Sequence, residues 1–299
     1  MSAHSTLDTF ELAVYYDHMI RITHSARAKV LLAALALFIV IGAYGIAQAD
    51  HAWGKYHWNL STADTLTNPL ALGDNLTAAA WQESLGGASA DWNTSLLKNV
   101  AVAGTSNANC DPTLGRVEVC NGAYGENGWL GIAQIWVYRG KDGHIAQAIV
   151  KLNDTYFALP QYGTPAWKNF VMCQEVGHTF GLDHQDEDFT NANLGTCMDY
   201  TNDPDGTLFD QLNNEHPNGH DYDMIASIYA HTHGAKGGGK GNGGGGGRPA
   251  ALPANAQIAL DGPAEWGQAV ATDAQGRNSK YVRSLEGGIE VVTHVLWAK

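Results

Sequence analysis

The chain has 299 residues, of which 44% are hydrophobic, so it can bury a packed core and is not a disordered protein. Its 30 acidic side chains outnumber its 17 lysines and arginines, for a formal net charge of -13 at pH 7. Because nucleic acids are bound by basic surfaces that neutralise phosphates, this charge argues against a nucleic-acid partner.

Residues 1–49 have the organisation of an export signal. Basic side chains precede an apolar run at 30–47, and Ala-Gln-Ala at 47–49 has the small-residue pattern of a signal-peptidase site. Cleavage there leaves a secreted chain that begins near Asp50. The alternative is an uncleaved membrane anchor with the domain outside the cell, because the apolar run is long enough to cross a bilayer.

Residues 50–233 are even in composition and form the predicted main domain. Two runs rich in β-branched and aromatic residues, 130–138 and 144–152, are joined through Asp142 and Gly143, a pair that favours a hairpin turn. We therefore expect the two runs to pair as antiparallel strands.

A helix is predicted over residues 165–180. Thr164 is a suitable N-cap, a proline follows at the first helical position, and Gly181 is a natural stop. Gln174 and His178 are one turn apart, so they share a face of this helix.

The composition changes after the last helix of the main domain, which is predicted at 220–231 with Asp221 as its cap. Residues 234–250 are mostly glycine and are predicted to form a flexible linker. Residues 251–299 contain short β-type runs and are predicted to form a small β module, too short to bury much core of its own.

The stretch around Glu175 has the spacing of a zinc site. Zinc in a hydrolase is held by three protein ligands and keeps one position for water. Gln174 and His178 lie above each other on the predicted helix, and a break at Gly181 lets the chain turn back so that His184 reaches the same point. Only the glutamine departs from the residue types that bind zinc well.

Together with the Cys-Met-Asp-Tyr segment at 197–200, this stretch resembles the metzincin metalloproteases, and the matrixin-like branch most closely. The family pattern is H-E-x-x-H-x-x-G-x-x-H with a later Met-turn, and the resemblance covers roughly residues 52–233. It places Gln174, His178 and His184 at the metal ligands, Glu175 at the catalytic glutamate, Met198 in the Met-turn and Tyr200 two residues beyond it.

The resemblance implies an α+β fold. Its parts are a twisted, mostly parallel sheet with residues 130–138 as an antiparallel strand at the edge of the cleft, an active-site helix, a Met-turn and a closing helix. It also implies a zinc-dependent endopeptidase that cleaves extracellular proteins or peptides as a monomer, with Glu175 as general base and acid.

Glutamine at position 174 is the departure from the family pattern, and its neutral amide oxygen suits calcium better than zinc. Three ways to complete the metal site stay open: Gln174 binds through oxygen, a nearby carboxylate or histidine takes its place, or water does. The nearby candidates are Asp183, Asp186, Asp188, His216 and His220. The acidic run at 181–188 is also a candidate for structural Ca²⁺, although it lacks EF-hand spacing.

Four cysteines in an exported chain predict two disulfides, for which the sequence allows three connectivities. The resemblance narrows the choice, because it brings the active-site helix close to the Met-turn. It implies a bond between Cys173 and Cys197, which leaves Cys110 to pair with Cys120. The matrixin pro-segment with its zinc-blocking cysteine has no counterpart, so we expect any latency to arise by another route.

Two other functions remain compatible with the sequence. In a pseudoprotease the cleft would bind peptide or protein partners without cutting them. In a surface-attachment protein the β module at 251–299 would bind the partner, and the main domain would be a scaffold.

Overall fold

The computed structural model describes residues 51–60, 66–105, 108–140, 142–230 and 252–299. The predicted export signal at 1–49 and the predicted linker at 234–250 lie outside these residues. Within the described ranges, the helices are all too short or too polar to cross a membrane. The apolar run at 30–47 is outside the ranges to which this finding applies.

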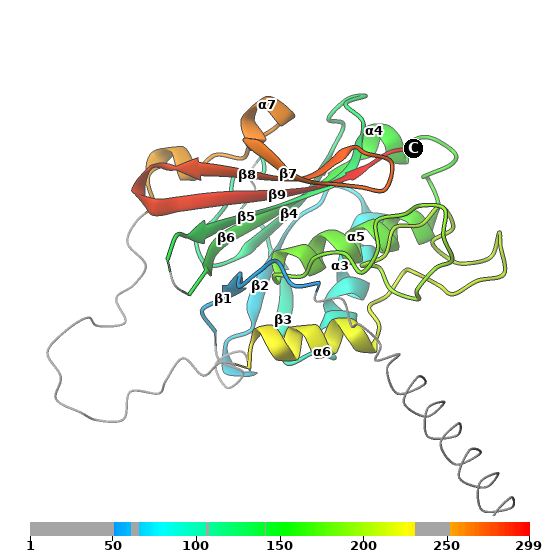
Figure 1. Ribbon diagram of the computed structural model, residues 1–299, viewed down its shortest axis with the longest axis horizontal. Helices are drawn as coiled ribbons and strands as arrows, with labels where there is room; N and C mark the ends of the chain where they lie inside the picture. Colours follow the sequence, from blue (N-terminus) through cyan, green and yellow to red (C-terminus); the bar gives the residue numbers. More distant parts are fainter. Residues whose placement is uncertain (1–50, 61–65, 106–107, 141, 231–251) are drawn as a thin grey trace, which may run out of the picture. The chain divides into compact units, whose positions relative to one another are not determined.

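The fold is a mixed α+β arrangement built on one sheet (Figure 1). Its strands are β1 (His57–Trp58), β2 (Leu70–Asn75), β3 (Asn99–Ala103), β4 (Val117–Gly122), β5 (Trp129–Tyr138), β6 (His144–Asn153), β7 (Gln268–Thr272), β8 (Asn278–Leu285) and β9 (Ile289–Trp297). The helices are α3 (Ala79–Trp92), α4 (Asp154–Phe157), α5 (Pro165–Thr179), α6 (Gly219–Ile228) and α7 (Pro263–Trp266), with short 3-10 turns at Ala254–Ala256 and Glu286–Gly288.

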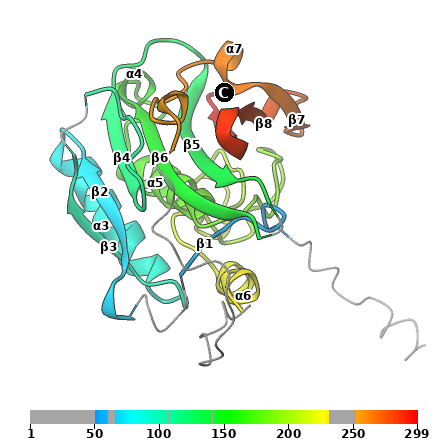
Figure 2. The ribbon, with the colours of Figure 1, turned by 90° about the vertical axis from the view of Figure 1, so that its left-hand side faces the viewer.

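Neighbouring strands follow the order β3-β2-β4-β6-β5-β9-β8-β7, and β1 also pairs with β6. The pairs among β1, β2, β3, β4 and β6 are parallel. The pairs from β6 through β5, β9 and β8 to β7 are antiparallel. The sheet is therefore half parallel and half antiparallel, with β6 at the junction (Figure 2).

Several local predictions are confirmed. Strands β5 and β6 pair antiparallel, as the Asp142 and Gly143 turn indicated. Helix α5 begins after Thr164, whose hydroxyl oxygen accepts a hydrogen bond from the Trp167 backbone N–H. It ends before Gly181, which has a φ of +99°. An added Cβ at this glycine would also lie 2.1 Å from the Tyr56 carbonyl oxygen, so only glycine fits the turn.

The cap predicted for the helix at 220–231 was one turn too late. Asn218 caps α6, and its side chain accepts from the backbone N–H groups of His220 and Asp221. Asp221 instead occupies the third helical position and accepts from the Asn218 N–H, which completes a capping box.

The largest difference from the sequence-based expectation concerns residues 251–299. Their strands do not form a separate β module but continue the main sheet, because β9 pairs with β5 along the whole of that strand. Consequently β5 is an interior strand and not the expected edge strand. The apolar pattern of β9 indicated a strand, but a strand's own pattern does not identify its partner.

Both faces of the sheet are covered. On one face, α3 and α5 pack over a core that includes Trp81, Trp92, Phe170 and Phe180. On the other face, residues 252–266 pack over a second core that includes Trp136, Trp266, Val291 and Val295. Strands β5 and β9 contribute side chains to both cores, so they lie at the centre of the fold.

Candidate metal centre

Helix α5 presents the key polar side chains to the interior. Gln174, Glu175 and His178 are each 0% exposed. The helix packs against α3 on one side and against β5 on the other. A polar face that is buried this completely requires partners, because an unpaired buried polar group is costly.

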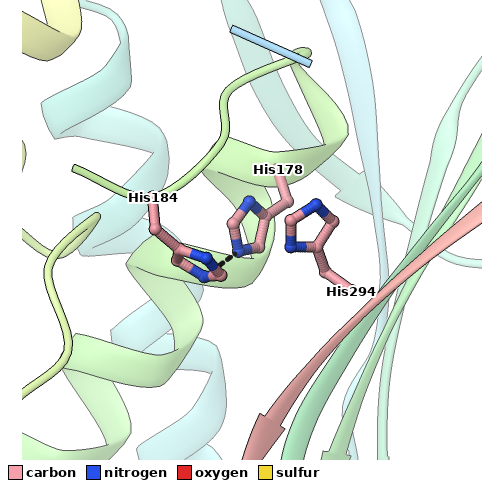
Figure 3. A group of neighbouring side chains, drawn as sticks. All are labelled: His178, His184 and His294. Carbon is pink, nitrogen blue, oxygen red and sulfur yellow. Dashed lines mark hydrogen bonds between the residues drawn. The ribbon is translucent and has the colours of Figure 1, made fainter. Parts of the chain in front are cut away.

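Three histidines converge beside this helix (Figure 3). His178 comes from α5, His184 from the loop after it, and His294 from the middle of β9. Their ligand nitrogens all lie within 4.8 Å of one another. The rings of His178 and His294 stack with centroids 4.1 Å apart, and the Nε2 atoms of His178 and His184 are separated by 2.9 Å.

The Nδ1 atoms of His178 and His184 make hydrogen bonds that point away from the cluster, and these bonds indicate which kind of ion the cluster can bind. The His178 Nδ1–H donates to the Leu182 carbonyl oxygen at 2.9 Å, and the His184 Nδ1–H donates to Glu187 Oε1 at 2.7 Å. When both rings are neutral, their Nε2 lone pairs therefore face each other and repel. A cation between them removes this repulsion, and imidazole nitrogen is a preferred ligand of zinc. The donor set thus fits a zinc ion.

His294 completes the cluster, and its Nε2 also lies 3.7 Å from Asp183 Oδ1, which is too far for a hydrogen bond. Both of its ring nitrogens lack a hydrogen bond to any described residue. Its ring also stacks on Trp53, with centroids 3.7 Å apart. Burial, followed by the neighbouring His178 and Lys280, lowers the pKa of His294 well below its ordinary value. Burial and His184 lower the pKa of His178 in the same way. Both rings are held neutral, which is the form that binds metals.

Glu175 lies against strand β5. An added Cβ at Gly131 would lie 2.6 Å from the Glu175 Oε1 atom, so this glycine makes room for the carboxyl group. Neither carboxyl oxygen has a hydrogen-bond partner in the part of the chain that the structure describes. Burial raises the pKa of Glu175 well above its ordinary value. Burial without a partner therefore favours the neutral, protonated form of this carboxyl group.

Gln174 is one turn before His178 and is equally buried. Its amide oxygen and nitrogen both lack partners among the described residues. Leaving a buried amide unpaired costs about 1–3 kcal/mol, so its retention here requires an explanation. Coordination of a metal through the amide oxygen is one, since the helical spacing matches that of two ligands on one face.

Met198 and Tyr200, which the resemblance associates with a Met-turn, contact helix α5 and His184 respectively. An added Cβ at Gly177 would lie 2.7 Å from the Met198 sulfur, so helix α5 and the segment around Met198 are in close contact. The Tyr200 ring packs edge-on against His184, with centroids 4.5 Å apart. Its hydroxyl donates to the Val295 carbonyl oxygen of β9 at 3.4 Å.

The disulfides have the connectivity implied by the resemblance. Cys173 is bonded to Cys197, and Cys110 to Cys120. The first joins α5 to the segment around Met198, immediately beside Gln174. It therefore fixes the helix that carries the site to the loop beneath it.

Of the nearby groups considered as replacement ligands, Asp183 lies beside the cluster, with its Oδ1 3.7 Å from His294 Nε2 and 3.8 Å from His184 Nδ1, and the others make contacts elsewhere. Asp183 pairs with Lys280, and Asp186 accepts from the Asp188 N–H. His216 pairs with Asp91, and the His220 ring packs on His51 with centroids 4.5 Å apart. None of these five is in the three-histidine cluster, although Asp183 forms a second acidic group with His184 and Glu187.

His294 was missed by the sequence analysis. The only local signal was an imidazole in the middle of the apolar run at 289–297, where a buried histidine needs a partner. Its place beside His178 depends on the pairing of β9 with β5, which the sequence pattern does not specify.

Comparison with known proteins gives little further information. Neither a protein-family model nor a curated protein matches the chain. The solved structure of Myroilysin aligns with 62% of this chain and 96% of its own, at 11% sequence identity and a TM-score of 0.31. This likeness is too low to carry a conclusion about fold or function.

Proposed function

We propose that the chain is a secreted, zinc-dependent peptidase that cleaves peptide bonds of extracellular proteins. The observation that carries the proposal is the convergence of three histidine ring nitrogens at helix α5, which also carries the buried, unpaired Glu175. His178 and His184 would hold the metal together with His294, and the Gln174 amide oxygen is available as a further ligand. Two disulfides are consistent with an oxidising compartment outside the cytosol.

Zinc, when bound, supplies Lewis acidity that polarises a carbonyl group and acidifies water. Glu175 performs the proton transfers. Its carboxylate takes a proton from the attacking water and delivers it to the amide nitrogen as the carbon–nitrogen bond breaks. A buried carboxyl group with a raised pKa suits both steps, because a general base works best when its pKa is near the working pH.

A pseudoprotease is the second candidate, and a specific observation favours it. Glu175, His178 and His294 are all fully buried, so the described conformation offers a substrate no direct path to them. A protein of this kind would bind zinc for stability, or would not bind it at all, and would not hydrolyse peptides.

Metal content and hydrolysis distinguish the candidates. The full chain, purified without chelator or a metal-binding tag, is expected to hold about one zinc by elemental mass spectrometry, as a single site of this kind requires. The His178→Ala variant should lose this zinc, because it lacks one of the ligands. Hydrolysis of a fluorescein-labelled unstructured protein is then compared between wild type and Glu175→Gln, and between His294→Ala, in which Gln174, His178 and His184 remain as ligands, and the double variant His294→Ala/Glu175→Gln.

A peptidase requires cleavage that depends on Glu175, reduced by about 10²–10⁴-fold in the double variant while its zinc remains. Bound zinc without such cleavage would favour the pseudoprotease. A full chain that stays free of metal even when zinc is offered would remove the basis of the proposal.

A further inference from the structure

Strand β9 covers the edge of β5 that a peptide would need. Extended peptides commonly bind by adding a strand to an open sheet edge. Glu175 lies against Gly131 of β5, so a peptide must lie along this strand for its scissile bond to approach the carboxyl group. In the structure β9 takes that position beside β5 (Figure 1). Leu296 pairs with Gly131, and His294 with Ala133.

The same strand fills the metal centre. A catalytic zinc keeps one position open for water, whereas a zinc with four protein ligands is closed. Gln174, His178 and His184 have the helix-and-turn spacing of three ligands, and His294 is a fourth. The strand that occupies the peptide edge therefore also delivers the side chain that would close the coordination sphere (Figure 3).

Contacts from β8 hold the hairpin onto the loop that carries His184. The Ser279 hydroxyl donates to Glu187 Oε2 at 3.1 Å, and Lys280 forms an ion pair with Asp183. Glu187 is also the residue that holds His184. The hairpin formed by β8 and β9 is thus attached to the metal centre in two ways. His294 of β9 belongs to the histidine cluster, and Ser279 of β8 contacts Glu187, which holds His184.

We propose that the β8–β9 hairpin is an internal plug that keeps the peptidase latent, with His294 as the fourth metal ligand and β9 in the place of the substrate strand. This inference rests on the proposed function. It accounts for a centre that has the groups for hydrolysis yet is fully buried. It also gives the weak ligand at position 174 a role, since Gln174, His178 and His184 remain as a three-ligand set when His294 leaves.

The coordination is tested in the full chain with Co²⁺ in place of zinc, because the visible spectrum of Co²⁺ reports its ligands. Azide is the probe of an open position. In wild type, azide should leave the spectrum unchanged. His294→Ala should keep its Co²⁺, shift the spectrum and bind azide. Glu290→Gln, at the other end of β9 where Glu290 accepts from the Tyr56 hydroxyl, is the matched control and should behave as wild type.

Whether the bound metal keeps the β8–β9 hairpin in place is tested by amide hydrogen exchange of residues 278–297, with and without zinc. Because Gln174, His178 and His184 still bind zinc after release, zinc at 100 times its dissociation constant should slow exchange through release of the hairpin by the ratio of the zinc affinities of the plugged and released states, which is at most about 100-fold. In His294→Ala, zinc should leave the exchange of these residues unchanged. His294→Gln is the second variant, and it should show the same uncoupling if the alanine variant folds poorly.

The outcomes separate the two proposals. A wild-type chain that binds no metal defeats the proposed function and this inference together. Bound metal with azide binding equal in wild type and His294→Ala, or with hairpin exchange that responds to zinc equally in both, overturns the plug alone and leaves the peptidase. Azide binding and uncoupled exchange only in the His294 variants support the plug.

Discussion

Glu187 holds His184 in place through a 2.7 Å hydrogen bond from the ring Nδ1–H to Oε1. The second carboxylate oxygen of Glu187 accepts from the Ser279 hydroxyl at 3.1 Å. The carboxylate therefore fixes both the tautomer and the orientation of the ring, and it leaves the His184 Nε2 lone pair directed at His178. Partners of this kind also raise the basicity of a metal-binding histidine.

Replacement of this carboxylate should weaken the metal site without unfolding the chain. Glu187→Gln is expected to lower zinc affinity by about 10–100-fold, because the amide is a weaker acceptor and carries no charge. Competition with a chromophoric chelator measures the affinity. Ser279→Ala is the matched control, since it removes only the second contact of Glu187 and should have the smaller effect. Equal affinities in Glu187→Gln and wild type would contradict a metal-supporting role.

Gly131 should be intolerant of even one methyl group. A Cβ there would lie 2.6 Å from Glu175 Oε1 and 2.7 Å from the Val171 Cγ1 atom. Gly131→Ala is expected to lower the free energy of unfolding by about 1–3 kcal/mol, the usual cost of overpacking a core. Urea denaturation measures the change. The control is Gly86→Ala in α3, where the added methyl meets nothing within 4 Å. The helix should gain roughly 0.5–1 kcal/mol there, so a similar gain at Gly131 would show that β5 and α5 are not tightly packed.

Local sequence patterns were sufficient for the elements that carry His178 and His184. The N-cap at Thr164, the stop at Gly181 and the hairpin turn at Gly143 are each determined by the residue itself and its immediate neighbours. The spacing of residues 174–184 likewise places its side chains at one end of α5. These features are fixed over a few residues, so they can be recognised without knowledge of the rest of the fold.

The third histidine could not be predicted on the same grounds. His294 is 110 residues from His184 in the numbering of the chain, and it reaches the site only because β9 pairs with β5 in one register. A shift of that register by one residue would turn the His294 side chain to the opposite face of the sheet. The register depends on two cores that many distant side chains form together, so no local pattern contains it.

The two disulfides should differ in what their removal does. In the chain-entropy model each contributes about 3 kcal/mol, since the bonds close loops with sequence separations of 24 and 10 residues. Cys173→Ala/Cys197→Ala should lower both stability and zinc affinity, because this bond holds α5 beside the metal centre. Cys110→Ala/Cys120→Ala should lower stability only. Denaturation and chelator competition on the same samples separate the effects, and an unchanged zinc affinity in both double variants would exclude a role for Cys173 in positioning the site.

Asp199 should make the fold less stable as the pH rises. Burial raises its pKa from 3.8 to about 6, against hydrogen bonds from the Leu194 N–H and the Asn214 amide that favour the charged form. A carboxyl group with a raised folded-state pKa stabilises the fold fully below its unfolded pKa, and this contribution is lost as the pH passes through the folded value.

Asp199→Asn should remove this dependence, because an amide oxygen can accept the same two hydrogen bonds and does not ionise. The free energy of unfolding of wild type, relative to the variant, is expected to fall by roughly 3 kcal/mol between pH 4 and pH 7, as a shift of about two pKa units requires. Urea denaturation across this range measures the difference. Parallel stability profiles for the two chains would mean that Asp199 is not held protonated in the fold, and a wild-type stability that rises relative to the variant as the pH increases would reverse the sign of the argument.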